Sequence, residues 1–305
     1  MDWKTGIQGF LNHLRLERGL SGNSLDAYRL DVEKLAQFSE LQDVPLKVSS
    51  LTTEDLERFM AYLHEIGMGA SSQARILSGI RAFFKYAILE GIREDNPANI
   101  IEGPRQSRKL PEVLDPDEMI TVLESIDLSL PQGHRNRAIL EVLYASGLRV
   151  SELIELRLSN LFAEAQLLRI IGKGNKERIV PIGKEALHYL KLYVQNERTQ
   201  LSIQKGEEDI IFLNRRGKRL SRQMIFLMIK KVVAEAGIQK SISPHTFRHS
   251  FASHMVEGGA DLRAVQEMLG HESILTTEIY THLQQSYLQD TIDQFHPRSR
   301  YSKKS

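Results

Sequence analysis

The decisive stretch of this chain is S-P-H-T-F-R-H-S-F-A-S-H-M, residues 243–255. It predicts a helix that begins with Ser243 as N-cap and Pro244 in the first helical position, where the missing N–H costs nothing. His245 and Arg248 stand three residues apart and therefore share one face. Free backbone N–H groups, the helix dipole and a guanidinium together favour phosphate oxygens. The stretch thus predicts an anion-binding site at the start of a helix.

Two other interpretations of the same stretch are open. A zinc site is one, because His245 and His249 lie four residues apart, but the zinc-hydrolase pattern also requires a glutamate where Thr246 stands. A core-facing helix is the other, since apolar residues recur at helical spacing, namely Phe247, Phe251 and Met255. In that case His249 and His254 are packing or hydrogen-bonding residues.

Composition limits the class of protein. The 305 residues, 41% of them apolar, suggest about two globular domains. The absence of cysteine excludes disulfides and thiolate metal sites and fits the cytoplasm. The opening M-D-W-K-T-G lacks a secretory signal, and no apolar run approaches membrane-spanning length, so we expect a cytoplasmic protein without a membrane partner. With a net charge of only +1, nucleic-acid binding would depend on local basic surfaces.

The first hundred residues predict a helical domain. Their apolar spacing and turn signals indicate four helices, at 3–18, 24–39, 53–66 and 71–90. The polar segment G-P-R-Q-S-R-K-L-P, residues 103–111, then breaks the helical pattern and predicts an interdomain linker. We therefore expect one domain over residues 1–102 and a second over 112–305.

The second domain predicts helices around a small antiparallel sheet. Helices are expected from Asp115-Pro116 and over 135–146. The run L-L-R-I-I-G-K-G-N-K-E-R-I-V-P-I, residues 167–182, breaks the helical period and predicts a β-hairpin around G-K-G-N-K. A long helix near 184–200 and a short strand over 210–213 should follow, and the rest is predicted to be helical. The fold class is mostly α with a small antiparallel β-sheet.

Other polar residues of this domain could carry chemistry, although each alone has an ordinary explanation. Arg149, at a helix end, could be a surface or capping residue. Lys173, between two glycines at the hairpin tip, could simply be solvated, and Arg178 could touch a nucleic-acid backbone. His271 could cap a helix, and Tyr280 could be a half-buried core residue.

Taken together, these residues resemble the tyrosine recombinase (phage integrase) family. Its active site is described as Arg, Lys, His-x-x-Arg, His or Trp, and Tyr, and the matching positions here are Arg149, Lys173, His245, Arg248, His271 and Tyr280. The resemblance covers the whole chain and implies a helical, SAM-like core-binding domain that clamps DNA, followed by an α+β catalytic domain. L-Y-A-S-G-L-R-V-S-E-L, G-K-G-N-K-E-R and H-P-R are most similar to the XerD-type recombinases, which resolve chromosome dimers.

The residue types suit the reaction that the resemblance implies. A tyrosine hydroxyl, here Tyr280, would attack a DNA phosphodiester and form a 3′-phosphotyrosyl intermediate. Because the reference pKa of tyrosine is about 10, its hydroxyl must be activated at neutral pH. His245 is the best candidate for this role by residue type. Arg149 and Arg248 would brace the two non-bridging oxygens as negative charge builds.

The same reaction requires no cofactor. Lys173 would protonate the leaving 5′ oxygen, and His271 would hydrogen-bond the phosphate. Because the phosphotyrosine stores the bond, rejoining requires no ATP, in agreement with the lack of a Walker-type run. No carboxylate cluster for Mg²⁺ is evident in the sequence, so we expect catalysis without a metal.

The resemblance also implies the partners. They are a double-stranded DNA recombination site, a homologous recombinase that completes a tetramer, and an FtsK-type DNA translocase. A phage or transposon integrase is the alternative role within the family. A non-catalytic DNA-binding protein is the alternative from another class; it would have lost some of the six residues, and all six are present.

The tail predicts a terminal amphipathic helix over residues 283–295. Leu288, Ile292 and Phe295 lie on one helical stripe and require a groove. Docked C-terminal helices are common, so packing on its own domain is one interpretation. The resemblance implies another, in which this exchange helix passes to the next subunit of a ring of four.

Overall fold

The computed structural model of the chain describes residues 1–104, 112–172, 176–270 and 282–301. The chain divides into two compact units, Met1–Lys109 and Leu110–Ser305, and the division falls within the predicted linker. The predicted fold class is confirmed: the described residues are mostly helical, with one small antiparallel sheet in the second unit. None of the described helices combines the length and the apolar character needed to cross a membrane.

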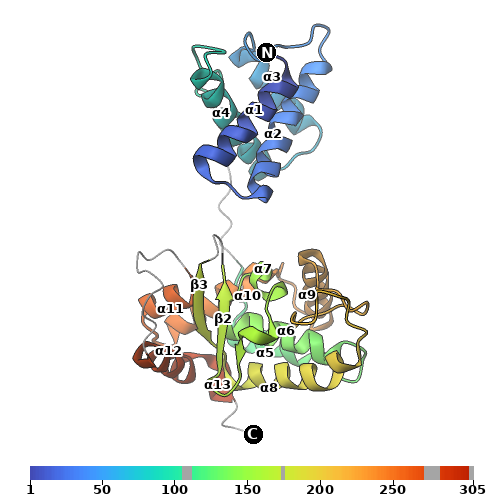
Figure 1. The fold of residues 1–305 in the computed structure, drawn as a ribbon, viewed down its shortest axis with the longest axis vertical. Coiled ribbons are helices and arrows are strands. Elements are labelled where there is room, and N and C mark those ends of the chain that lie inside the picture. Colours follow the sequence, from blue (N-terminus) through green and yellow to red (C-terminus); the bar gives the residue numbers. More distant parts are fainter. Residues whose placement is uncertain (105–111, 173–175, 271–281, 302–305) are drawn as a thin grey trace. The chain divides into compact units, whose positions relative to one another are not determined.

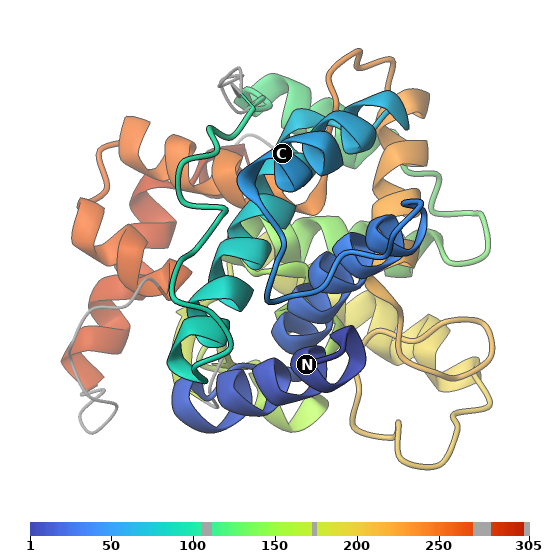
Figure 2. The ribbon, with the colours of Figure 1, turned by 90° about the horizontal axis from the view of Figure 1, so that it is seen from above.

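The first unit consists of four helices, coloured blue to teal in Figures 1 and 2. They are α1 (Trp3–Arg18), α2 (Gly22–Glu40), α3 (Thr53–Glu65) and α4 (Ala70–Leu89), each within two residues of its prediction. Local signals explain this agreement, since Asp2 caps α1 at one end and Gly19 adopts a left-handed conformation at the other. Buried aromatic rings, among them Phe10 and Phe83 with centroids 5.5 Å apart, fill the core.

The second unit is built around α6 (Gly133–Ser146), which is buried along most of its length. Against it pack α8 (Lys184–Leu192) and α10 (Pro244–Glu257). The predicted helix over 184–200 is α-helical only to Leu192; a π-helical turn and a 3₁₀ turn complete it. The 3₁₀ turn begins at Arg198, whose buried guanidinium donates to Ile210 O (2.9 and 3.1 Å) and so ties the helix end to a neighbouring segment. The other helices are α5 (Pro116–Glu124), α7 (Val150–Ile154), α9 (Arg222–Glu235), α11 (Leu262–Leu269), α12 (His282–Phe295) and α13 (Pro297–Tyr301).

The sheet has three antiparallel strands in the order β1 (Leu161–Phe162), β2 (Leu167–Ile171) and β3 (Glu177–Pro181). The predicted hairpin is therefore confirmed, and Gly172 N donates to Lys176 O (2.7 Å) at its base. Helices α11 and α12 pack against β3 (Figure 1).

The predicted strand over 210–213 is wrong. Ile210 and Leu213 each form a single isolated bridge, to Arg157 and to Arg219 respectively. Because the two bridges go to different segments, no ladder forms. Ile211 and Phe212 between them are fully buried. The apolar residues of 210–213 therefore reflect burial in the core and not pairing in a strand.

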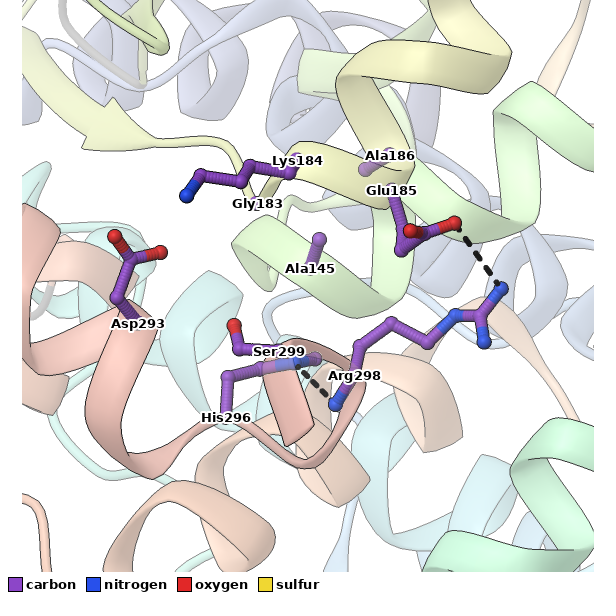
Figure 3. A pocket seen from close by; sticks show the side chains of 9 residues that line it. All are labelled: Ala145, Gly183, Lys184, Glu185, Ala186, Asp293, His296, Arg298 and Ser299. Atoms are coloured by element: carbon purple, nitrogen blue, oxygen red, sulfur yellow. Dashed lines mark hydrogen bonds and ion pairs between the residues drawn. The ribbon is translucent and has the colours of Figure 1, made fainter. Parts of the chain in front are cut away.

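The C-terminal helices α12 and α13 pack within their own unit. Leu288 and Ile292 belong to its core, as in the first of the two interpretations of this segment. Beyond α12, the ring of His296 lies 4.6 Å from that of Tyr144, and Arg298 donates to Glu141 (2.7 Å). Figure 3 shows His296 and Arg298 beside a cavity of about 190 Å³ at the start of α8. Passage of the helix to another subunit stays a prediction.

Acid should unfold the second unit through His296. Burial lowers the pKa of His296 to about 3, whereas an unfolded histidine titrates near 6.5. Below pH 6.5 the unfolded chain therefore binds a proton that the folded chain does not, and the free energy of unfolding should fall by about 1.4 kcal/mol per pH unit until the folded group titrates. Burial also lowers the pKa of His254, which acts in the same direction.

The slope is measured by urea unfolding between pH 7.5 and 5.0. Circular dichroism follows both units, and fluorescence of Trp3, the single tryptophan, follows the first unit alone. His296→Gln should reduce the pH slope of the second unit by about one proton. The control Ile292→Val lowers stability in the same region and should keep the slope. An undiminished slope in His296→Gln would contradict the assignment.

Candidate active site

The helix predicted from residues 243–255 is α10. It has Ser243 as N-cap and Pro244 in its first turn, and Ser243 N donates to Thr246 Oγ1 (3.2 Å). The predicted apolar stripe is confirmed, since three of its side chains are fully buried: Phe247, Phe251 and Met255. The start of the helix is thus held firmly against the core.

The histidines of α10 have different surroundings. His254 is buried, and its Nδ1 lies 2.8 Å from the hydroxyl of Tyr144, so its predicted hydrogen-bonding role is confirmed. His249 is exposed, contrary to the packing interpretation, and His245 is exposed in the first turn. Among the residues that the structure describes, no three His, Asp or Glu side chains are grouped so that they could hold a metal ion.

Arg248 joins the ends of two helices. Its Nη1 donates to Gly147 O (2.7 Å), just after α6, and its Nη2 donates to Leu269 O (2.6 Å), at the end of α11. Burial and the positive charge of Arg149 lower the pKa of Arg248 to about 10. It is still protonated at neutral pH. Its contact with Gly147 O ties it to the backbone two residues before Arg149.

Arg149 is the N-cap residue of α7, and capping was one of the ordinary roles considered for it. Glu152, three residues on, accepts from Arg149 N (2.8 Å) and from Arg149 Nη1 (2.9 Å). The side chain of Arg149 retains 40% of its surface exposed, so the guanidinium is held on one side and open on the other. This geometry suits a ligand that approaches from solvent.

Glu152 is a site residue that the sequence analysis missed. The residue is only 7% exposed, and its carboxylate also accepts hydrogen bonds from both Nη groups of Arg178 (2.9 Å each). Burial alone would raise the pKa of Glu152, but the hydrogen bonds and charge of Arg178, with those of Arg149, outweigh it and hold the pKa below its ordinary value. The signal in the sequence is weak: an acidic residue at the third position of a short helix.

Arg178 is not a solvated contact to a nucleic-acid backbone, as its hairpin position suggested. It is 7% exposed, and its Nε donates to Met268 O (2.9 Å) near the end of α11. The alternation of β3 places Arg178 on the same face as the buried Val180, which is the signal that could have indicated its burial.

Three of the six predicted site residues belong to the described structure. Arg248 contacts the carbonyl of Gly147, two residues before Arg149, and His245 lies one turn before Arg248 on α10. The other three, Lys173, His271 and Tyr280, lie outside the described residues. This arrangement presents two cations beside a helix N-terminus, which is suited to bind a phosphate group.

Gly147 sets the spacing between α6 and Arg149. Its φ is +57°, and a Cβ there would lie 2.6 Å from Phe251 Cδ1 and 2.9 Å from Leu269 Cδ2. Gly147→Ala should therefore destabilise the second unit by roughly 2–4 kcal/mol, since backbone strain and overpacking add. Gly237→Ala is the matched control, because Gly237 has a φ of +73° and nothing within 4 Å of its Cβ position.

Urea unfolding of the two variants separates the two contributions. Gly237→Ala should lose only the part due to strain, about 1 kcal/mol. Equal losses in both variants would mean that the contact of Gly147 with Phe251 and Leu269 does not constrain the site.

Two protein families match most of this chain. The phage integrase family matches residues 112–286, and its N-terminal SAM-like domain matches residues 7–91. Tyrosine recombinase XerD of Staphylococcus saprophyticus is 45% identical over 97% of this chain and 99% of its own length, and XerD of Staphylococcus aureus is 43% identical over 97% and 100%.

Solved structures are similar as well. XerH site-specific recombinase bound to a palindromic difH substrate matches with a TM-score of 0.69 and 25% identity, over 90% of this chain and 81% of that one. A lambda integrase tetramer bound to a Holliday junction has a TM-score of 0.70 at 19% identity, over 92% and 80%, which indicates a shared fold. The chain therefore belongs to the phage integrase family of tyrosine recombinases.

Proposed function

We propose that the chain is a site-specific recombinase that cuts and rejoins double-stranded DNA through a 3′-phosphotyrosyl intermediate. The observation that carries this proposal is the pair of guanidiniums, Arg149 and Arg248, anchored on their inner sides next to the N-terminus of α10. Such a pair can contact the two non-bridging oxygens of one phosphodiester. The 45% identity to a XerD recombinase supports the same activity.

In the first half of the reaction, the hydroxyl of Tyr280 attacks the scissile phosphorus. His245 accepts the hydroxyl proton or stabilises its loss, and Arg149 and Arg248 stabilise the charge that builds on the non-bridging oxygens. The bond from phosphorus to the 5′ oxygen breaks as the tyrosyl bond forms.

The leaving 5′ oxygen then requires a proton. Lys173 is the proposed general acid, and His271 the proposed hydrogen-bond donor to the phosphate. In the second half, a 5′ hydroxyl from the other strand attacks the phosphotyrosine, so the number of phosphodiester bonds is conserved and no nucleotide hydrolysis is required.

The biological role that we propose is the resolution of chromosome dimers in the cytoplasm at cell division. The identity to XerD proteins over nearly the full length of both chains favours this role over that of a phage or transposon integrase. The proposed partners are a recombination site in the chromosome, a homologous recombinase and an FtsK-type translocase. A tetramer is expected, as in the lambda integrase complex on a Holliday junction.

Exchange of the C-terminal helix between subunits is part of this proposal. Helix α12 begins at His282, two residues after Tyr280. A change in its packing partner would therefore act on the segment that carries the nucleophile, and cutting would depend on assembly.

Replacement of Tyr280 should separate binding from chemistry. Tyr280→Phe retains the ring but lacks the attacking oxygen, so it should bind a half-site like wild type and form no covalent complex. A nicked suicide substrate, analysed in denaturant, measures the protein–DNA adduct. Adduct formation at the wild-type level by the variant would exclude Tyr280 as the nucleophile.

The role of Lys173 can be tested by changing the leaving group. Lys173→Ala should cleave an ordinary phosphodiester roughly 10²- to 10⁴-fold more slowly, because the 5′ oxygen leaves without a proton. A 5′-bridging phosphorothiolate, whose sulfur leaves unprotonated, should restore most of the rate. An equal loss on both substrates would rule out general acid catalysis by Lys173.

A further inference from the structure

We propose that Arg178 is a positioning residue for strand cleavage, which holds Arg149 and the end of α11 in register without touching DNA. The inference rests on the proposed function, in which Arg149 and Arg248 contact the scissile phosphate. The sequence suggested only a solvated contact to a nucleic-acid backbone for Arg178, because of its place on a hairpin.

The contacts of Arg178 join three segments that are distant in sequence. The residue itself belongs to β3, two residues after Lys176 at the base of the hairpin. Its two Nη groups donate to Glu152, which holds both the backbone N–H and the guanidinium of Arg149. Its Nε donates to Met268 O, next to the Leu269 carbonyl that accepts from Arg248. One guanidinium therefore sets the position of α7 relative to β3 and α11.

The site is shaped for this guanidinium. Gly270, with a φ of +65°, ends α11 where a Cβ would lie 3.1 Å from Arg178 Cδ and 3.2 Å from its Nε and Nη1. The planar guanidinium of Arg178 donates to Glu152 through two nitrogens and to Met268 O through the third at the same time. A lysine ammonium carries the same charge but cannot reproduce this geometry.

The charges of the cluster explain why the position of Arg178 affects Arg149. Two guanidiniums, those of Arg149 and Arg178, contact the carboxylate of Glu152, while Arg248 is held by the carbonyls of Gly147 and Leu269, so the three cations outnumber this carboxylate and the cluster remains positive toward a phosphate. Without Arg178, Arg149 would be the one guanidinium left to pair with Glu152 in the part of the chain that the structure describes. The carboxylate would then draw Arg149 inward and neutralise the charge that the phosphate requires.

The test compares two suicide substrates in single-turnover cleavage. One has an ordinary scissile phosphodiester, and the other a methylphosphonate, which lacks one charged non-bridging oxygen and so requires less positive charge in the transition state. Arg178→Lys should slow cleavage of the phosphodiester roughly 10- to 100-fold, as expected for a displaced charge donor. Its cleavage of the methylphosphonate should be close to that of wild type. Arg149→Ala, which removes the donor itself, should lose even more activity on the phosphodiester relative to the methylphosphonate.

Arg198→Lys is the matched control. Arg198 is also 7% exposed, and its guanidinium holds backbone carbonyls of the same unit, at Glu208 and Ile210. Loss of these guanidinium contacts should lower the stability of the unit but should not change the ratio of the cleavage rates of the two substrates. The bias between substrates therefore distinguishes positioning from a general loss of stability.

The outcomes separate the inference from the function on which it rests. Absence of cleavage by wild type would overturn the proposed function and the inference with it. Cleavage by wild type, with Arg178→Lys equally impaired on both substrates or not impaired at all, would overturn the inference alone. If Arg178→Lys fails to bind a half-site, the paired variant Arg178→Met with Glu152→Gln removes both buried charges and keeps the unit folded. A wild-type rate on the phosphodiester in that variant would overturn the inference, and a selective loss larger than that of Glu152→Gln alone would support it.

Discussion

The buried carboxylate of Glu152, shared between Arg149 and Arg178, is the interaction on which the site depends. A buried carboxylate such as that of Glu152, a residue only 7% exposed, stays ionised only if its oxygens accept hydrogen bonds, and here four donor groups supply them. Buried ion pairs of this kind add little net stability, although the loss of one partner typically costs about 3–5 kcal/mol. The main effect of the cluster is to fix the position of α7 relative to β3, since other arrangements of the two would separate Glu152 from Arg178.

The ends of the helices determine where the cations lie. The last carbonyls of a helix have no partner within it and stand at the negative end of its dipole, so they attract guanidiniums. Arg248 donates to Gly147 O after α6 and to Leu269 O in α11, and Arg178 donates to Met268 O in α11. The N-terminus of α10, which is the positive end of its helix dipole, carries His245. Helix C-termini thus hold the arginines from behind, and a helix N-terminus favours the anion in front.

The sequence was sufficient for features that depend on near neighbours along the chain. The first four helices, the start of α10 and the hairpin are specified by caps, glycines and apolar spacing, and all were predicted. The strand over 210–213 was not specified in this way, because burial alone produces the same apolar run. Arg178 and Glu152 could not be paired from sequence, since 26 residues separate them and only the folded sheet brings them together. The partners of Arg149 and Arg248 required tertiary structure for the same reason.

A second buried carboxylate constrains the C-terminal segment in a similar manner. Glu141 in α6 has no exposed surface and is shared by Arg137 (3.0 Å) and Arg298 (2.7 Å). If α12 and the residues beyond it pass to a neighbouring subunit, Arg298 must leave Glu141 unless the equivalent arginine of another subunit replaces it. A buried carboxylate with one partner fewer is costly, so release without replacement is disfavoured. Exchange would then be favourable only in a closed ring, where every departing arginine is matched by an arriving one.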